Sequence, residues 1–319
     1  MTGPPPAVAA TRLAVRRSLV GVTGPVSAAV SGGADSLALA CALAFERPGS
    51  AAVVVDHRLQ DGSADVAARA AAQCADLGLT SRVLIAPLLP FGANPHGQGR
   101  VDLRQRGGGV AVRRGPEGEA RAARYVLLDA LEGTVLLGHT RDDQAETVLL
   151  GLIRGSGTRA TSGMSVVRGA YRRPFLDLSR VMTRQTCTEA GLTPWEDPHN
   201  EDEAYARVRV RRLLGAFQDN GADLTKGLVR SARLLREDAD ALDALTTPTD
   251  EVADLLAMAP ALRSRALKAW AEQQSGQALN SVHVDALRAL VEGWRGQGPV
   301  ALPGGGRVAR EGGRLAFRR

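Results

Sequence analysis

Short clusters of polar residues in this 319-residue chain have the types and spacing to carry out chemistry together. The first cluster stands between an apolar segment and a helical pattern, and consists of Ser31, Gly32, Gly33, Ala34, Asp35 and Ser36. Its glycines let the backbone approach an anion, the helix start offers unpaired N–H groups, and the serine hydroxyls add donors. These features predict a phosphate-binding loop, with a purely structural tight turn as the alternative. Asp35 could then hold Mg²⁺ against the phosphate.

The loop lacks the residues that define two other classes of nucleotide-binding motif. No Lys-Ser or Lys-Thr pair follows the glycines, as in a Walker loop, and no Gly-x-Gly-x-x-Gly run marks a dinucleotide fold. The loop instead resembles the N-type ATP pyrophosphatase family, whose fingerprint is Ser-Gly-Gly-x-Asp-Ser after the first strand. The resemblance implies cleavage of ATP between the α and β phosphates, which gives pyrophosphate and an adenylated substrate.

The second cluster is Asp56-His57, at the end of an apolar run of strand length. In a doubly wound sheet this end lies beside the point where the strand order reverses, which is where ligands bind. The Asp56 carboxylate could accept a hydrogen bond from an adenosine hydroxyl or amine of bound ATP. An Asx cap that starts the next turn is an equally good explanation.

The third cluster follows the fourth apolar run and combines a histidine with three carboxylates: His139, Asp142, Asp143 and Glu146. On a helix, residues four apart share a face, and this spacing would place His139 and Asp143 side by side. The same spacing joins Asp142 to Glu146, so the side chains are predicted to converge. Beside an ATP loop they could bind Mg²⁺, hold an amine nucleophile or take its proton. Acids also stabilise a helix N-terminus, so a capping cluster is the alternative.

After Asp197 the chain carries a basic run, with Tyr205, Arg207, Arg209, Arg211 and Arg212. If this run is helical, Arg207 and Arg211 share a face; if it is extended, Arg207, Arg209 and Arg211 do. In either geometry the guanidinium groups could bind phosphate or a carboxylate. A solvated basic helix is the alternative.

Three of these segments together resemble the tRNA(Ile)-lysidine synthetase family. They match, in the family's order, the patterns VDHxLR, HTxDDQAETVL and DPxNxDxxYxRxRxR, at Val55–Gln60, His139–Leu149 and Asp197–Arg211. Gln60 departs from the first pattern, which has Arg there. Shorter stretches that contain Arg173 and Ser179-Arg180 are also similar to family segments.

The resemblance implies a two-step modification of the wobble cytidine in isoleucine tRNA with anticodon CAU. ATP adenylates the C2 carbonyl oxygen of the cytidine, and the ε-amine of L-lysine then displaces AMP to give lysidine. In this scheme His139 and Arg173 line the nucleotide site. Arg207 and Arg211 stabilise phosphate charge or position tRNA. Metal binding, lysine recognition and deprotonation fall, in an order left open, to Asp142, Asp143 and Glu146.

Apolar runs of strand length alternate with helical periodicity, which predicts a doubly wound α/β fold with a parallel sheet to hold these residues. The predicted strands are residues 26–30, 51–55, 82–85 and 134–137. The predicted helices are residues 7–19, 35–45, 64–77, 117–131 and 142–153. Between Pro87 and Gly118 the periodicity fails, which predicts either a functional loop or a short hairpin.

After about Gly215 the pattern becomes helical, and one apolar stripe contains Leu228, Ala232, Leu235, Ala239 and Leu242. Further helices are predicted over residues 251–258, 262–274 and 282–294, the last one capped by Ser281. Glycine pairs within Pro299–Phe317 indicate a terminal hairpin. The sequence therefore predicts an adenylation domain of residues 1–216 and a smaller, helical tRNA-binding domain of residues 217–319.

Composition suits a polyanionic partner, since the formal net charge of +6 comes mainly from arginine. No apolar run approaches the roughly 20 residues that span a bilayer, so no membrane segment is expected. Cys41, Cys74 and Cys187 form no metal-ligand or disulfide pattern, which favours the reducing cytoplasm and counts against a tRNA thiolase. The second alternative to the ligase function is a non-catalytic module that binds RNA by electrostatic attraction. A homodimer is a further expectation.

Overall fold

The computed structural model describes residues 3–58, 62–86, 116–198, 202–221 and 223–319. Within that part the chain forms two compact units. The first contains the described residues before Gly155 together with Gly163–Arg230, and the second contains Gly155–Ser162 and Ser231–Arg319. Most of the segment predicted to be irregular, and Gln60, lie outside the described residues. The predicted domain boundary at residue 216 stays a prediction.

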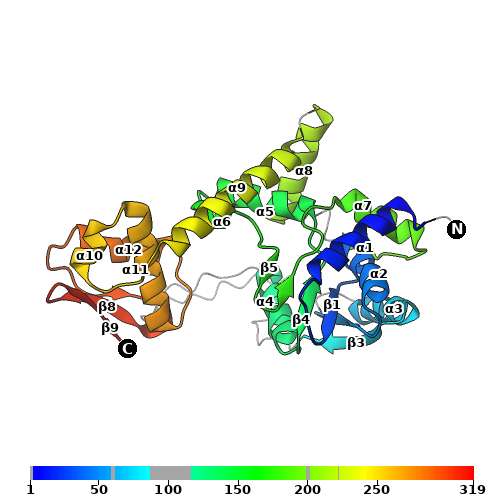
Figure 1. The fold of residues 1–319 in the computed structure, drawn as a ribbon, viewed down its shortest axis with the longest axis horizontal. Coiled ribbons are helices and arrows are strands. Elements are labelled where there is room, and N and C mark those ends of the chain that lie inside the picture. The colour runs from blue at the N-terminus through cyan, green and yellow to red at the C-terminus, as the bar shows by residue number, and fades with distance from the viewer. Residues whose placement is uncertain (1–2, 59–61, 87–115, 199–201, 222) are drawn as a thin grey trace, which may run out of the picture. The chain divides into compact units, whose positions relative to one another are not determined.

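A six-stranded sheet forms the centre of the first unit (Figure 1). Its strands are, in spatial order, β3 (Thr80–Ile85), β2 (Ala51–Asp56), β1 (Val26–Val30), β4 (Thr134–Leu137), β6 (Tyr171–Arg172) and β5 (Val167–Arg168). Neighbouring strands run parallel, except that β5 pairs antiparallel with β6. The predicted doubly wound α/β fold is confirmed, and the structure adds a short antiparallel strand at one edge.

The central strands are rich in alanine and valine because helices cover both faces of a parallel sheet. The register of β1 pairs Ala28 with Ala52 of β2 on one side and with Leu136 of β4 on the other, and all three side chains are fully buried. The strand order reverses between β1 and β4. The carboxyl ends of these two strands therefore flank the switch point, where doubly wound folds bind ligands.

Helices pack around this sheet. In the first unit they are α1 (Pro6–Ser18), α2 (Ala34–Glu46), α3 (Ser63–Asp76), α4 (Pro116–Asp129), α5 (Arg141–Ile153), α7 (Arg180–Glu189) and α8 (Ala206–Asp219). α1, α2 and α7 pack against one another, α3 packs on β2 and β3, and α5 packs on α8. The sequence pattern predicts all of these helices except α7 and α8. No helix in the described part of the chain is long and apolar enough to cross a membrane.

The second unit combines helices with a three-stranded antiparallel sheet. Its elements are α6 (Thr158–Thr161), α10 (Val252–Ala257), α11 (Pro260–Ser275), α12 (Ser281–Glu292), β7 (Val300–Ala301), β8 (Arg307–Glu311) and β9 (Arg314–Arg318). Helix α9 (Leu224–Ala244) begins in the first unit and continues into the second. The terminal hairpin predicted from the glycine pairs is confirmed as β8 and β9.

The cap of α12 differs from the prediction. Asn280, rather than Ser281, is the N-cap, and Ser281 is the first residue of the helix. The Asn280 side chain accepts a hydrogen bond from the His283 amide (3.1 Å), while His283 Nδ1 accepts one from the Asn280 amide (3.3 Å). The reciprocal pair satisfies two N–H groups of the helix start, which a serine one position later would not reach.

Candidate active site

The predicted phosphate-binding loop joins the end of β1 to the start of α2. Gly32 has a φ of +87°, a left-handed conformation that favours glycine, and Gly33 is the N-cap of α2. The Ser36 hydroxyl donates to the Gly33 carbonyl (2.9 Å) and accepts from the Ser31 amide (3.1 Å), which closes the loop on itself. Among the described residues no side chain caps α2, so its N-terminus can receive an anion.

Gly138, directly after β4, lets the chain that leads into α5 approach this loop. A Cβ atom at Gly138 would lie 2.9 Å from the carbonyl oxygen of Asp35, closer than side chains come to a backbone atom. Glycine therefore permits a close approach of the two segments that the Cβ atom of any other residue would prevent. The result is that the first turn of α2 and the residues before α5 meet at the switch point of the sheet.

The N-terminus of α5 is closed by Thr140, which is its N-cap. The Asp143 carboxylate accepts hydrogen bonds from the Thr140 amide (2.8 Å) and hydroxyl (2.9 Å). The capping explanation considered for the acidic cluster therefore holds for Asp143. His139 precedes the helix, so the helical spacing predicted between His139 and Asp143 does not apply. The two groups still interact, because the His139 charge helps to lower the pKa of Asp143.

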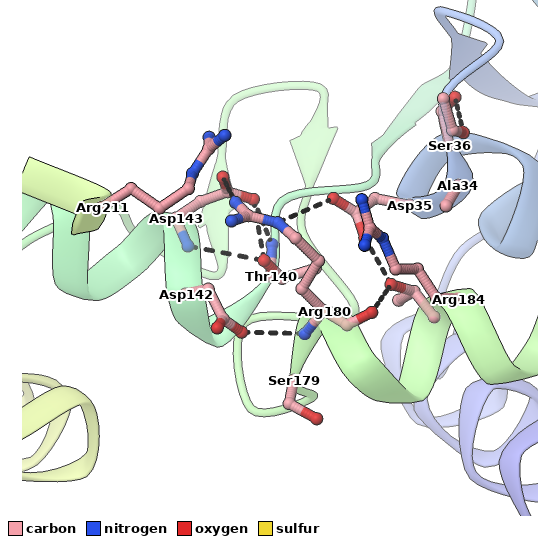
Figure 2. Close-up of polar contacts among 12 residues, drawn as sticks. Ala34, Asp35, Ser36, Thr140, Asp142, Asp143, Ser179, Arg180, Arg184 and Arg211 are labelled. Carbon is pink, nitrogen blue, oxygen red and sulfur yellow. Dashed lines mark hydrogen bonds and ion pairs between the residues drawn. The ribbon is translucent and has the colours of Figure 1, made fainter. Parts of the chain in front are cut away.

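Arg180, the first residue of α7, lies among the carboxylates (Figure 2). Its Nη2 donates to Asp143 Oδ1 at 2.8 Å and lies 3.3 Å from Glu146 Oε1. Its Nε lies 3.7 Å from Asp35 Oδ2, and its backbone amide donates to Asp142 Oδ2 at 2.8 Å. The four carboxylates predicted from the sequence are thus brought together around one residue.

Asp35 is held by α7 through a second contact, a hydrogen bond from the Thr183 hydroxyl to Asp35 Oδ1. Burial raises the pKa of Asp35 to about 6; the Thr183 bond opposes this rise, and the Asp143 charge adds to it. Arg180 lowers the same pKa, because its positive charge favours the carboxylate. The carboxylate of the phosphate-binding loop therefore takes up a proton at a higher pH than an ordinary aspartate does.

Asp143 shows the opposite shift. Burial alone would raise its pKa, but the Arg180 charge and the hydrogen bonds from Thr140 hold it below the ordinary value, with a smaller contribution from His139. The pKa of Arg180 is raised: burial would lower it, and the charges of Asp143 and Glu146 outweigh burial. Asp143 and Arg180 therefore form a fixed ion pair at the centre of the site.

Glu146 is the most buried of the four carboxylates, with a side chain only 2% exposed. Its Oε1 accepts from Arg211 Nε at 2.9 Å and from both Nη atoms of Arg180 at 3.3 Å. Its Oε2 is buried and has no hydrogen-bond partner within the described ranges. Arg211 lies on α8, so the helical alternative for the basic run is the correct one, and Arg207 lies one turn earlier on that helix.

Other predicted residues follow neighbouring strands at the carboxyl edge of the sheet. Asp56 ends β2, and its Oδ1 accepts from the backbone amide two residues later (2.9 Å), which is the Asx turn considered as the alternative. Arg173 follows β6, is 4% exposed and donates to a backbone carbonyl at 2.8 Å. His57 accepts from Arg124 Nε at 3.1 Å, and burial lowers its pKa to about 4.

Comparison with known proteins identifies the family. A family model described as a PP-loop domain matches residues 22–216, and one described as the TilS substrate binding domain matches residues 251–316. The chain is 46% identical to the tRNA(Ile)-lysidine synthase of Salinispora arenicola, over 97% of this chain and 96% of that protein. The chain belongs to the tRNA(Ile)-lysidine synthase family. It is also 42% identical to the lysidine synthase of Streptomyces coelicolor, over 99% of each chain.

Membership of the lysidine synthase family confirms the resemblance inferred from the sequence motifs. Among solved structures, the fold is similar to that of the U34-tRNA thiolase NcsA from Methanococcus maripaludis, with a TM-score of 0.56. The two chains are 18% identical, and the match covers 72% of this chain and 80% of the thiolase. At that identity the likeness concerns the fold alone, and it agrees with the PP-loop domain found in the lysidine synthases.

The sequence of this lysidine synthase family member marks Ser179-Arg180 as similar to a family segment, but it assigns no role to Arg180 and does not point to Thr183. Both lie on α7, a mostly polar helix whose buried face consists of Thr183, Thr186 and Cys187 rather than large apolar side chains. A local structural signal is Ser179, whose hydroxyl accepts from the Met182 amide at 3.3 Å and caps the helix. A serine in that place predicts a helix start, but it does not predict which carboxylates the next residue meets.

Proposed function

We propose that the chain is an ATP-dependent carbon–nitrogen ligase that joins L-lysine to C2 of the wobble cytidine in isoleucine tRNA with anticodon CAU. The products are lysidine in the tRNA, AMP and pyrophosphate. One observation carries the proposal. In a chain of the tRNA(Ile)-lysidine synthase family, four carboxylates and two guanidinium groups gather beside a loop suited to phosphate.

Adenylation is proposed at the loop between β1 and α2. The cytidine O2 attacks the α-phosphorus of ATP, the bond from that phosphorus to the bridging oxygen breaks, and pyrophosphate leaves. The N-terminus of α2 at Gly33 and the hydroxyls of Ser31 and Ser36 would donate to the phosphates and to the charge that builds up on them. The rest of the nucleotide would contact the residues that follow neighbouring strands: Asp56, His139 and Arg173.

Magnesium is proposed at Asp35. In nucleotide enzymes Mg²⁺ is bound by one or two carboxylates together with substrate phosphates and water. Asp35 lies in the loop itself with its side chain 27% exposed, which suits a ligand shared with ATP. Among the described residues no group of three or more His, Cys, Asp or Glu could hold a metal ion by itself, so the phosphates would complete the coordination. The ion would neutralise phosphate charge.

Lysine transfer needs an amine that is first recognised and then deprotonated. Carboxylates outnumber the guanidinium groups of Arg180 and Arg211 in this cluster, and the excess of negative charge attracts an ammonium group. Glu146 Oε2 is buried and has no hydrogen-bond partner in the part of the chain that the structure describes, and such an oxygen gains most from a charged donor. We therefore assign recognition of the lysine ammonium to Glu146.

The assignment leaves distinct tasks to the other two carboxylates of α5. Asp143 is engaged by the helix cap and by Arg180, so it would fix the geometry of the site. Among the described residues one oxygen of Asp142 is engaged, by the amide of Arg180, and the carboxylate could receive the proton from lysine. The neutral amine then attacks C2, the C2–O bond breaks, and AMP departs with the oxygen.

Binding of the tRNA is proposed for the basic face of α8 and for the second unit. Arg211 is 35% exposed although it bonds Glu146, and Arg207 lies on the same face one turn away. The match of residues 251–316 to a substrate binding domain supports a role of that region in holding tRNA. The predicted homodimer and cytoplasmic location stay predictions.

A tRNA thiolase is the main alternative because it would use a similar ATP loop. Sulfur transfer requires a thiolate or a cluster held by cysteines. Cys41, Cys74 and Cys187 are buried and free. Burial raises the pKa of Cys74 to about 11 and that of Cys187 to about 12, so these thiols stay protonated at neutral pH. The residues therefore favour the ligase.

Incubation of the purified protein with ATP, labelled lysine and a CAU tRNA transcript tests the proposal. We expect lysine-dependent release of AMP with label entering the tRNA. A transcript with uridine at the wobble position is the matched control and should accept no label. Release of AMP that requires a sulfur donor, or no release at all, would overturn the proposed function.

A further inference from the structure

One helical turn contacts all four carboxylates of the site. It is the first turn of α7, from the Ser179 cap to Thr183 (Figure 2). The Arg180 guanidinium contacts Asp35, Asp143 and Glu146. The backbone amide of Arg180 donates to the fourth carboxylate, Asp142. Because Asp35 belongs to α2 and the other three belong to α5, this turn of α7 connects two helices that carry different parts of the site.

Four carboxylates at such short range repel one another, and the repulsion opposes a fixed arrangement. The cluster is poorly screened by water, since the side chains of Arg180, Asp143 and Glu146 are 20%, 16% and 2% exposed. A guanidinium group has five donors in one rigid plane and can bond several carboxylates at set directions. The ammonium of a lysine carries the same charge without that planar geometry.

We propose that Arg180 is a positioning residue that holds the adenylation and lysine-transfer groups in register with each other. It joins Asp35 of the phosphate-binding loop to the pair formed by Asp143 and Glu146. The inference rests on the proposed function, in which Asp35 serves the ATP step and Glu146 receives lysine. Arg180 acts through these carboxylates, so its loss should misplace the groups of both half-reactions at once.

Thr183 provides the contrast that separates the two links made by α7. Its hydroxyl contacts Asp35 and the Arg180 carbonyl, and none of its hydrogen bonds recorded among the described residues reaches a carboxylate of α5. Thr183→Val keeps the shape of the side chain and removes the hydroxyl. It should therefore impair adenylation alone, whereas Arg180→Met should impair both steps.

The experiment measures each half-reaction by itself on the full chain. Adenylation is followed as tRNA-dependent exchange of pyrophosphate into ATP without lysine, and transfer as the reaction of adenylated tRNA, made beforehand by the wild-type protein, with labelled lysine. The variants are Arg180→Met, Arg180→Lys and Thr183→Val. Arg16→Met is the matched control, because Arg16 forms an ion pair (2.7 Å) with Glu46 at the far end of α2, about 16 Å along the helix from Asp35.

We expect Arg180→Met to lower kcat/KM in both half-reactions by about 100-fold, the size of effect that a misplacement of about 1 Å produces. KM for ATP and for lysine should both rise, whereas partial unfolding would lower kcat at unchanged KM. The kcat/KM values of Arg180→Lys should lie between those of Arg180→Met and the wild type. Thr183→Val should affect adenylation only, and Arg16→Met neither step.

Three results would overturn the inference while leaving the proposed function intact. The first is an active wild type together with an Arg180→Met variant whose kcat/KM lies within twofold of that of Arg16→Met in both assays. The second is a loss confined to one half-reaction. The third is a loss of kcat at unchanged KM that matches the unfolded fraction seen by thermal unfolding. A wild type that neither exchanges pyrophosphate nor transfers lysine would overturn the proposed function, and this inference with it.

Discussion

Replacement of Glu146 by glutamine removes one charge from the site with almost no change in shape. In the wild type, Oε1 accepts from Arg211 and Arg180, and Oε2 is buried without a partner in the described structure. A glutamine can keep its carbonyl oxygen toward Arg211 and place its amide nitrogen where Oε2 lies in the wild type. The substituted amide would then face the lysine ammonium with a donor in place of an acceptor.

The expected loss of lysine binding follows from Coulomb's law. Two unit charges about 4 Å apart attract by about 4 kcal/mol at an effective dielectric constant of about 20. At about 1.4 kcal/mol per tenfold, removal of the charge raises KM for lysine by up to about 1000-fold. Asp142 and Asp143 remain and supply part of the attraction, so we expect a rise of about 10- to 1000-fold.

The cost to folding should be much smaller. The charge-assisted hydrogen bonds to the two arginines become ordinary ones, which lowers the free energy of unfolding by about 1–2 kcal/mol. Removal of a buried charge that lacks a full set of partners partly offsets this loss. The net change should lower Tm by no more than about 5 °C. Glu46→Gln is the matched control, because Glu46 has a side chain only 6% exposed and pairs with Arg16 away from the site.

Steady-state kinetics with saturating ATP and CAU tRNA measure KM for lysine, and pyrophosphate exchange without lysine measures adenylation. Glu146→Gln should raise KM for lysine and leave exchange within about threefold of the wild type. Normal KM for lysine together with lost exchange would show that Glu146 serves the ATP step, which would refute the assignment. A comparable rise of KM in Glu46→Gln would refute the electrostatic reasoning.

Three further predictions use the same assays. Asp35→Ala should abolish pyrophosphate exchange while tRNA affinity, measured by filter binding, stays within about twofold, since the proposed phosphate contacts to RNA lie elsewhere; normal lysidine formation would contradict it. Arg211→Met should lower lysine transfer by about tenfold because Glu146 loses its 2.9 Å partner. Arg209→Met should not, because the hydrogen bonds of Arg209 among the described residues go to backbone carbonyls. The pKa of His57 falls from about 6.5 to about 4 on folding, so the unfolded chain takes up its proton first and stability falls as pH drops through this window. His57 is partly exposed, so solvent screening reduces the effect. Urea unfolding should show a loss of less than about 2 kcal/mol between pH 7.5 and pH 5 that is absent in His57→Gln, and equal pH dependence in both proteins would contradict this account.

Much of the sheet could be predicted because the relevant signal is local. Val26–Val30 and Thr134–Leu137 are short apolar runs between turn residues, and the structure has strands with those bounds. The two-residue strands β5 and β6 carry no such run, and they pair only because β4 offers a free edge. The helical spacing of Asp142 and Glu146 was also sufficient to predict that both project from one helix.

The arrangement around Arg180 could not be predicted, because it depends on how distant segments pack. Arg180 and Asp35 are far apart in sequence, and they meet because α7 packs on α2. Asp143 had two explanations, cap or catalytic carboxylate, and the sequence could not reveal that its two oxygens are engaged by Thr140 and Arg180. Residue type alone could not decide whether Asp56 binds adenosine or forms an Asx turn, and the Asx turn is visible only in the structure.

The most direct test of the account is the chemical identity of the wobble nucleoside after the reaction. CAU tRNA would be incubated with the wild-type protein, ATP and isotopically labelled lysine, digested to nucleosides and analysed by mass spectrometry. The account predicts that cytidine at the wobble position is replaced by lysidine that carries the label, with one AMP released for each lysine added. Unchanged cytidine, or a sulfur-containing nucleoside in its place, would contradict it.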